Sequence, residues 1–204
     1  MAPSGYPSRV IGVLVSGLGT NLQAIIDAEL PIAGVISSKP GVQALERAER
    51  AGIANAVFRL EDFPDREARD AAMADWLVER GVTTVALAGF MWLLREPFFE
   101  RFPRVIITHS ALLPAFPGIH PVEDALVYGV KWTGATVHYV EAAGVDSGEI
   151  ILQEPVPVAE DDTVETLRER VKAAEHRLLP EACRLALAGR LHIAEGSRRV
   201  LVTP

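Results

Sequence analysis

The sequence predicts an α/β fold, with an open, mostly parallel, twisted sheet, helices on both faces, and an antiparallel strand pair toward the C-terminal end. Through the first half of the chain, short β-branched apolar runs alternate with segments of helical periodicity, an order typical of a parallel sheet covered by helices. After His120 two β-rich runs follow, joined by the glycine-containing loop EAAGVDSG. At 204 residues the chain suits one large domain better than two.

The elements of the parallel part alternate in order, and each strand is a short run rich in valine, isoleucine or alanine. The predicted strands are residues 9–15, 32–37, 54–58, 82–89 and 104–109. The predicted helices between them are residues 21–30, 41–52 and 65–81. Glycines at the ends of the last two, Gly52 and Gly81, are helix stop signals.

The remaining predicted elements are two strands and one long helix. Residues 133–140 (TGATVHYV) and 149–158 (EIILQEPVPV) are the antiparallel pair. Residues 162–189 are typical of a helix, in which Pro180 is expected to cause a kink or a break.

Composition excludes several classes of protein. The net charge of −7 argues against a nucleic-acid partner, which needs a basic surface. There is no apolar run of 18 residues and no secretory signal at the start, so we expect a soluble cytoplasmic protein without membrane contact. The single cysteine, Cys183, lies in a helical pattern and is interpreted as a small core residue. No Cys/His spacing suggests a metal site.

The segment VLVSGLGTNLQAI predicts a strand, a glycine turn and a helix start, which is a typical place for a phosphate. A dinucleotide fingerprint needs a third glycine where Leu22 stands, and an acidic residue where the chain reads SSKP. A single phosphate is therefore favoured over a nicotinamide dinucleotide. Thr20 and Asn21 are expected to cap the helix and to contact the same phosphate. A plain strand-to-helix turn stays open as the alternative.

Two polar residues are candidates for acid–base chemistry. His109 ends a predicted strand, and ligands of open α/β sheets bind beyond the carboxyl ends of the strands. Asp146 lies in the glycine-flanked loop GVDSGE; if this loop folds over the same edge, its carboxylate can orient His109 and favour the imidazolium. Ordinary structural roles for both residues stay open.

Taken together, several segments resemble the phosphoribosylglycinamide formyltransferase family. They are SGLGTNLQAIID, LAGFM, HSALLPAFPG, GATVHYV, ILQEPVPV and EHRLLPEA, in the order of that family and over nearly the whole chain. The resemblance implies a single formyltransferase domain over residues 1–204, with the nucleotide phosphate site in its N-terminal half and the folate site in its C-terminal half. It implies transfer of a formyl group from the co-substrate 10-formyltetrahydrofolate to glycinamide ribonucleotide, without a metal. Monomer and homodimer both stay open.

The resemblance also implies roles for particular residues. His109 and Asp146 correspond to the catalytic pair, and His138 to a further active-site histidine. The implied ribonucleotide-binding residues are Gly19, Thr20, Asn21, Lys172, Ala173, Ala174 and Glu175, with Glu175 placed to take the amine. The implied folate-binding residues are Arg66, Met91, Trp92, Leu93, Leu94, Ile107, Ala142, Ala143, Gly144, Val145 and Asp146.

The sequence departs from the family pattern at the end of the active strand. Where family members usually have asparagine two residues before the histidine, this chain has Ile107, which offers no side-chain hydrogen bond. Ser110 stands where proline is usual, Trp92 where arginine is frequent, and Glu149 where proline is usual. We therefore expect intact ligand pockets and slow turnover.

Three alternatives to an active formyltransferase remain. The first is a catalytically weak relative that binds nucleotide or folate, which Ile107 favours. The others are a formyltetrahydrofolate hydrolase, which usually has an extra N-terminal domain, and a methionyl-tRNA formyltransferase, which usually has an extra C-terminal one. The length of the chain argues against both, and its acidity argues against tRNA.

Overall fold

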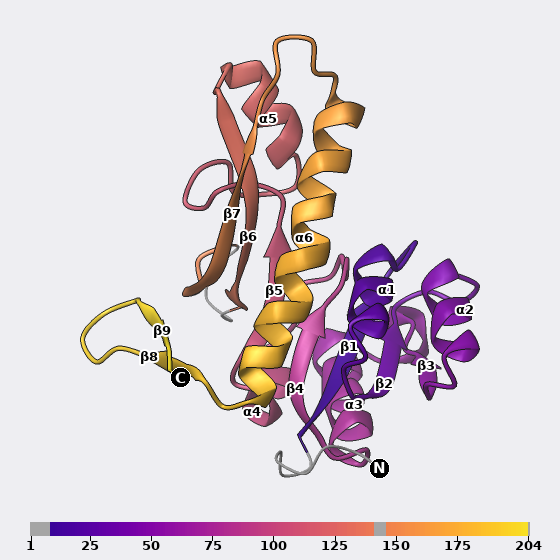
Figure 1. Cartoon of the computed structure of the whole chain (residues 1–204). Helices are drawn as coiled ribbons and strands as arrows, with labels where there is room; N and C mark the ends of the chain where they lie inside the picture. Colours follow the sequence, from indigo (N-terminus) through magenta and orange to yellow (C-terminus); the bar gives the residue numbers. More distant parts are fainter. Residues whose placement is uncertain (1–8, 141–145, 204) are drawn as a thin grey trace.

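The computed structural model describes residues 9–140 and 146–203. Seven strands form one sheet in the order β3-β2-β1-β4-β5-β6-β7, and β8 and β9 form a separate hairpin (Figure 1). The strands are β1 Val10–Val15, β2 Ile32–Ser37, β3 Asn55–Val57, β4 Val82–Leu87, β5 Val105–His109, β6 Trp132–Val140, β7 Ile150–Pro157, β8 Leu191–Ile193 and β9 Val200–Val202. The α-helices are α1 Thr20–Asp27, α2 Gln43–Arg50, α3 Arg66–Val78, α4 Glu96–Arg101, α5 Pro121–Tyr128 and α6 Val164–Leu187, with a 3₁₀ turn at Leu60–Asp62.

The predicted fold class is confirmed. Strands β1 to β5 pair in parallel, and β6 runs antiparallel to both β5 and β7. The predicted antiparallel pair is therefore β6 and β7, and it extends the parallel sheet instead of standing apart from it. Because β5 is followed by an antiparallel neighbour, its carboxyl end lies where the strand direction changes.

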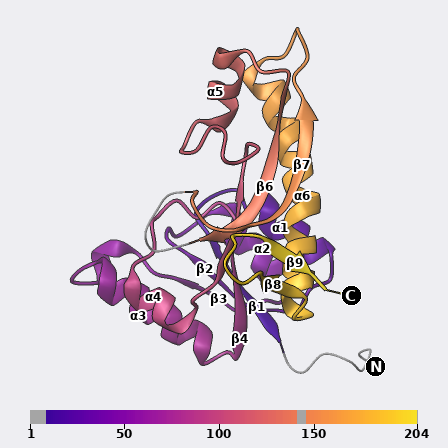
Figure 2. The ribbon, with the colours of Figure 1, turned by 90° about the vertical axis from the view of Figure 1, so that its left-hand side faces the viewer.

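Helices cover both faces of the sheet, with α3 and α4 on one side and α6 on the other (Figure 2). Consecutive residues of β1 point to opposite faces of the sheet, which shows why the strand is apolar throughout. Val13 packs in the cluster with α1 and α6, and Leu14 packs in the cluster with α3. A strand buried on both faces requires a continuous apolar run, and this run made the sheet predictable.

Helix α6 continues through Pro180, so the expected break does not occur. The residue loses one backbone hydrogen bond, but the helix buries an apolar stripe on both sides of it, including Leu179 and Cys183. The Cys183 thiol is fully buried, and burial raises its pKa to about 12, which fits the predicted core role.

Short elements were not predicted from the sequence: α4, α5 and the β8–β9 hairpin. Helix α4 has six residues and strands β8 and β9 have three each, too few for a periodic signal to stand out. Helix α5 was missed although it has eight residues, as many as the predicted helices α1 and α2. In the described part of the chain, no helix is both long and apolar enough to cross a membrane.

Candidate active site

The carboxyl ends of β4 and β5 open onto a cavity of about 580 Å³. Its walls come from the loop after β4, from the end of β5 and from β6, α1 and α6. The residues with chemical or predicted roles that line it are Asn21, Met91, Trp92, Leu93, Leu94, Ile107, Thr108, His109, Ser110, His138, Asp146 and Glu175. The structure thus brings together residues that are up to 154 positions apart in the chain.

His109 lies at the inner end of this cavity and is 6% exposed. Its Nε2 is 2.7 Å from the carbonyl oxygen of Phe116, and its Nδ1 is 3.4 Å from Oδ2 of Asp146. Both ring nitrogens therefore face oxygen acceptors. The predicted meeting of His109 and Asp146 occurs.

The segment after Asp146 passes close to the end of β6. A Cβ on Gly148 would lie 1.7 Å from the carbonyl oxygen of Tyr139, so only glycine allows this close return. The backbone N–H of Gly118 donates to Asp146 Oδ2 at 2.8 Å and fixes the carboxylate from the other side. These two backbone contacts help to place the carboxylate beside His109.

Asp146 faces a second imidazole as well. His138 Nε2 lies 3.7 Å from Asp146 Oδ1, and His138 Nδ1 lies 2.7 Å from the carbonyl oxygen of Tyr139. Burial raises the pKa of the Asp146 carboxyl, but the nearby imidazole of His138, the hydrogen bond from the Gly118 N–H and the neighbouring His109 outweigh it. The net effect holds the Asp146 pKa below its usual value and keeps the carboxylate ionised.

Ile107 is the cross-strand neighbour of His138 and lines the same cavity. Its side chain also packs against the apolar cluster that contains Phe90 and Leu94. An isoleucine suits this half-buried strand position, but it presents only carbon atoms to the cavity. The place beside His109 where the family resemblance predicts an amide therefore has no side-chain donor of its own.

The start of α1 differs from the expectation. Gly19 is the N-cap residue with φ 71°, and no side chain caps the helix, because Thr20 and Asn21 are already helical. The predicted caps are therefore wrong. A Cβ on Gly19 would lie 2.6 Å from the Cβ of Ala44, so this turn requires glycine for space and for conformation.

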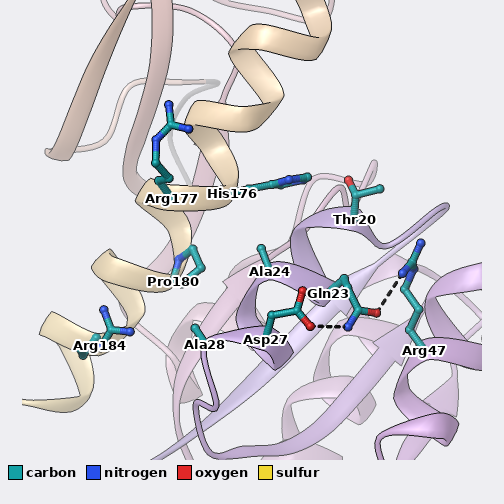
Figure 3. Close-up of a pocket in the computed structure, with 10 residues that line it drawn as sticks. All are labelled: Thr20, Gln23, Ala24, Asp27, Ala28, Arg47, His176, Arg177, Pro180 and Arg184. Carbon is teal, nitrogen blue, oxygen red and sulfur yellow. Dashed lines mark hydrogen bonds between the residues drawn. The ribbon is translucent and has the colours of Figure 1, made fainter.

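Thr20 and Asn21 point to different cavities. Asn21 Nδ2 donates to Glu175 Oε2 at 3.0 Å and to Thr108 Oγ at 3.4 Å, inside the cavity of His109. Thr20 lines a second, more open groove of about 640 Å³ between α1 and α6 (Figure 3). The helix start thus lies between the two spaces.

The second groove was not predicted from the sequence, and its polar side chains are mainly basic. Arg47 donates from Nη1 to Gln23 Oε1 at 2.9 Å, and Gln23 Nε2 donates to Asp27 Oδ1 at 2.8 Å (Figure 3). Arg47 also donates to the carbonyl oxygen of Leu18 at 3.0 Å, which ties α2 to the glycine turn. No local sequence signal distinguishes this arginine from others on α2.

Of the segment Lys172 to Glu175, only Glu175 lines the first cavity. Ala174 packs in the core cluster with Val171, Ala173 is exposed, and Lys172 pairs with Glu169 at 3.2 Å. This distribution follows from helical geometry, since consecutive residues of α6 point about 100° apart.

The loop after β4 forms the wall predicted for folate. Met91 and Leu93 are exposed at the mouth of the cavity, and Leu94 is buried behind them. Trp92 lies against two guanidinium groups, with Arg66 Cζ at 5.2 Å and Arg69 Cζ at 5.6 Å from its ring centroid. Arg66 thus reaches the site through Trp92. Ala142, Ala143, Gly144 and Val145 lie outside the described residues.

The wall is anchored by a buried ion pair that sequence reasoning missed. Arg69 and Asp70 have fully buried side chains, and Asp70 Oδ1 accepts from Arg69 Nε at 2.9 Å and Nη2 at 2.7 Å. Asp70 Oδ2 accepts from the backbone N–H of Arg95 at 2.8 Å. The only sequence hint is that both charged residues fall on the buried face of a predicted helix.

Comparison with known proteins identifies the family of the chain. Residues 9–183 match the family model described as formyl transferase, and the chain belongs to the formyl transferase family. It is 45% identical over 185 residues to phosphoribosylglycinamide formyltransferase from Mycobacterium tuberculosis, covering 88% of this chain and 85% of that protein. Its structure matches glycinamide ribonucleotide transformylase 1 from Symbiobacterium toebii with a TM-score of 0.92 and 49% identity, over 96% of this chain and 94% of the other.

Larger relatives match only in part. The chain is 44% identical over 200 residues to the trifunctional purine biosynthetic protein adenosine-3 of Bos taurus, covering 95% of this chain. It spans about a fifth of the length of that relative, since the match covers 20% of it. Within the described residues, no group of three or more His, Cys, Asp or Glu side chains is arranged to hold a metal ion.

Proposed function

We propose that this formyl transferase moves the formyl group of 10-formyltetrahydrofolate to the amine of glycinamide ribonucleotide. The observation that carries the proposal is the meeting of His109, Asp146 and Glu175 around one cavity at the end of β5. His109 with Asp146 can donate a proton to a carbonyl oxygen, and the Glu175 carboxylate can accept hydrogen bonds from an amine. These two roles suit a reaction between a carbonyl carbon and an amine.

In this reaction His109, as an imidazolium, donates a proton toward the formyl oxygen while the amine attacks the carbon. For this step, the Nε2–H of His109 leaves the carbonyl oxygen of Phe116 and donates to the developing oxyanion, while Nδ1 stays beside Asp146. Asp146 orients the imidazole and relays the proton that the attacking nitrogen releases to the folate nitrogen. When the tetrahedral intermediate collapses, the bond between the formyl carbon and the folate nitrogen breaks, the protonated folate nitrogen departs, and the proton on the formyl oxygen returns to His109. Glu175 accepts hydrogen bonds from the amine before attack. No covalent enzyme intermediate is required, which agrees with the inert environment of Cys183.

We assign the substrates to opposite sides of the cavity within one domain. The ribonucleotide lies between the start of α1 and α6, with Gly19, Thr20 and Asn21 at its phosphate end and Glu175, the one residue of the segment 172–175 that lines the cavity, beside its amine. Free backbone N–H groups of a helix start favour a phosphate. The folate lies against the wall formed by Met91 to Leu94 and the loop that ends at Asp146, with Arg66 behind Trp92.

A rate assay with purified protein tests the proposal. We expect formyl transfer from 10-formyltetrahydrofolate to glycinamide ribonucleotide, and no transfer to water at a comparable rate. Faster release of formate than formylation of the amine would instead identify a formyltetrahydrofolate hydrolase. Binding of both substrates without either product would identify a catalytically weak binding protein, the alternative that Ile107 favours.

A further inference from the structure

Glu175 is a buried carboxylate held only by neutral groups. It is 7% exposed, and it accepts a hydrogen bond from Ser110 Oγ to Oε1 at 2.5 Å and another from Asn21 Nδ2 to Oε2 at 3.0 Å. Among the described residues, no arginine, lysine or histidine nitrogen lies within 4.0 Å of its oxygens. A buried carboxylate without a cation is costly, and hydrogen bonds to neutral donors offset only part of that cost.

The remaining hydrogen-bonding capacity around Glu175 consists of acceptors. Asn21 Oδ1 is buried and has no hydrogen-bond partner within the described part of the chain. Its amide nitrogen is turned to Glu175, so the amide oxygen is left to accept. Each Glu175 oxygen also has lone pairs beyond the one already used. A cluster of unfilled acceptors around a buried negative charge suits a primary amine or ammonium group, which offers donors.

Ser110 links this acceptor to the catalytic strand, because it directly follows His109. Ser110 is bonded to His109 along the chain, and its hydroxyl donates a hydrogen bond to Glu175. Ser110 therefore fixes the position of Glu175 relative to the imidazole of His109. The sequence alone marked Ser110 only as a departure from the usual proline, a residue with no donor in its side chain.

We propose that Ser110 is a positioning residue that holds the Glu175 carboxylate for the amine of the acceptor substrate. This inference rests on the proposed function and deepens it. It concerns substrate position and not proton transfer, so it predicts a change in the KM of one substrate only.

Steady-state kinetics on Ser110→Ala test the proposal. A hydrogen bond to a charged group typically contributes enough to change binding by about tenfold or more. We expect the KM for glycinamide ribonucleotide to rise about tenfold, and the KM for 10-formyltetrahydrofolate and kcat to change less than about threefold. Ser110→Thr, which keeps the hydroxyl, should restore the KM to within about threefold. Ser197→Ala in the β8–β9 turn is the matched control and should behave like the unaltered chain.

The possible outcomes separate this proposal from the proposed function. Equal KM values for Ser110→Ala and the unaltered chain would overturn the role of Ser110 and leave the formyl transfer intact. If the unaltered chain transfers no formyl group, calorimetric binding of glycinamide ribonucleotide to the same variants decides. A tenfold loss that threonine restores supports the positioning role; equal affinities overturn it. If Ser110→Ala does not fold, Ser110→Cys, with its weak S–H donor, replaces it and should show the same loss.

Discussion

Two regions of the molecule bury a carboxylate, and they do so in opposite ways. In α3, Asp70 is fully buried with its own cation, Arg69, and its second oxygen accepts the backbone N–H of Arg95. Between β5 and α6, Glu175 is nearly as buried but receives only neutral donors. The first carboxylate has its charge balanced by the fold; the second does not.

This difference distinguishes a buried carboxylate with a structural role, Asp70, from a buried carboxylate with a functional role, Glu175. Asp70 has its cation within α3, although Arg69 Nη1 has no hydrogen-bond partner among the described residues and burial raises the Asp70 pKa. The pair also fixes the loop that forms the wall of the cavity, through the backbone N–H of Arg95. An unpaired carboxylate that lines a cavity becomes fully compensated only when a positively polarised ligand binds. Asp146 stands between these cases, since its partners are two histidines whose charge depends on protonation.

The largest effect is expected from His109→Ala, which removes the acid from the functional region. Loss of a general acid typically lowers turnover by about 10²–10⁴-fold. We expect formyl transfer to fall by that factor, while folate binding by fluorescence titration and the melting temperature stay nearly unchanged. A large drop in melting temperature would place His109 with the structural group instead.

Asp70→Ala should show the opposite pattern. Removing one partner of a buried ion pair typically costs about 3–5 kcal/mol of unfolding free energy, because Arg69 would keep an uncompensated buried charge. Urea unfolding measures this loss. The double variant Arg69→Met with Asp70→Leu is the control and should recover most of the stability. Full stability of Asp70→Ala together with lost activity would contradict the distinction between the two regions.

Ile107→Asn tests whether stability and function compete at one position. An oxyanion donor is typically worth about 10²–10³-fold in turnover, and we expect at least about a tenfold rise in kcat at saturating substrates. The melting temperature should fall slightly, because an amide replaces an apolar side chain in a strand. If the unaltered chain already turns over as fast, another group supplies the donor and the interpretation of Ile107 as impairing is wrong.

The smallest effect is expected from Asp146→Asn. The neutral amide cannot hold His109 as an ionised carboxylate does, so activity should fall. The loss of activity that accompanies protonation of the Asp146 carboxylate at low pH should be absent from the pH–rate profile of the variant. Because the Asp146 pKa is depressed in the folded protein, its carboxylate contributes stability above about pH 3.9, and this contribution is lost as the pH falls through the lower folded value. Asp146→Asn should lack this contribution. An identical pH–rate profile would argue against the pairing with His109.

Most of the fold was predictable because its signal is local. The apolar runs of β1, β2, β4 and β5 are continuous since both faces of the sheet are covered, and the helices between them have a buried stripe. Short elements such as α4 and the β8–β9 hairpin were missed because three to six residues contain too little periodicity. A kink or a break was expected at Pro180. The helix does not break there, because packing on both sides of the proline maintains it.

The candidate site divides in the same way. The sequence by itself determined that His109 ends a strand and that a glycine turn starts α1, because these features depend on neighbouring residues. Only the tertiary structure decided that Asn21 turns to Glu175 instead of capping its helix, that Ser110 meets Glu175, and that Arg69 pairs with Asp70 beneath Trp92. The direction of a side chain and the partner of a buried charge depend on which elements pack together, and residues distant in the chain set the free energy of that packing.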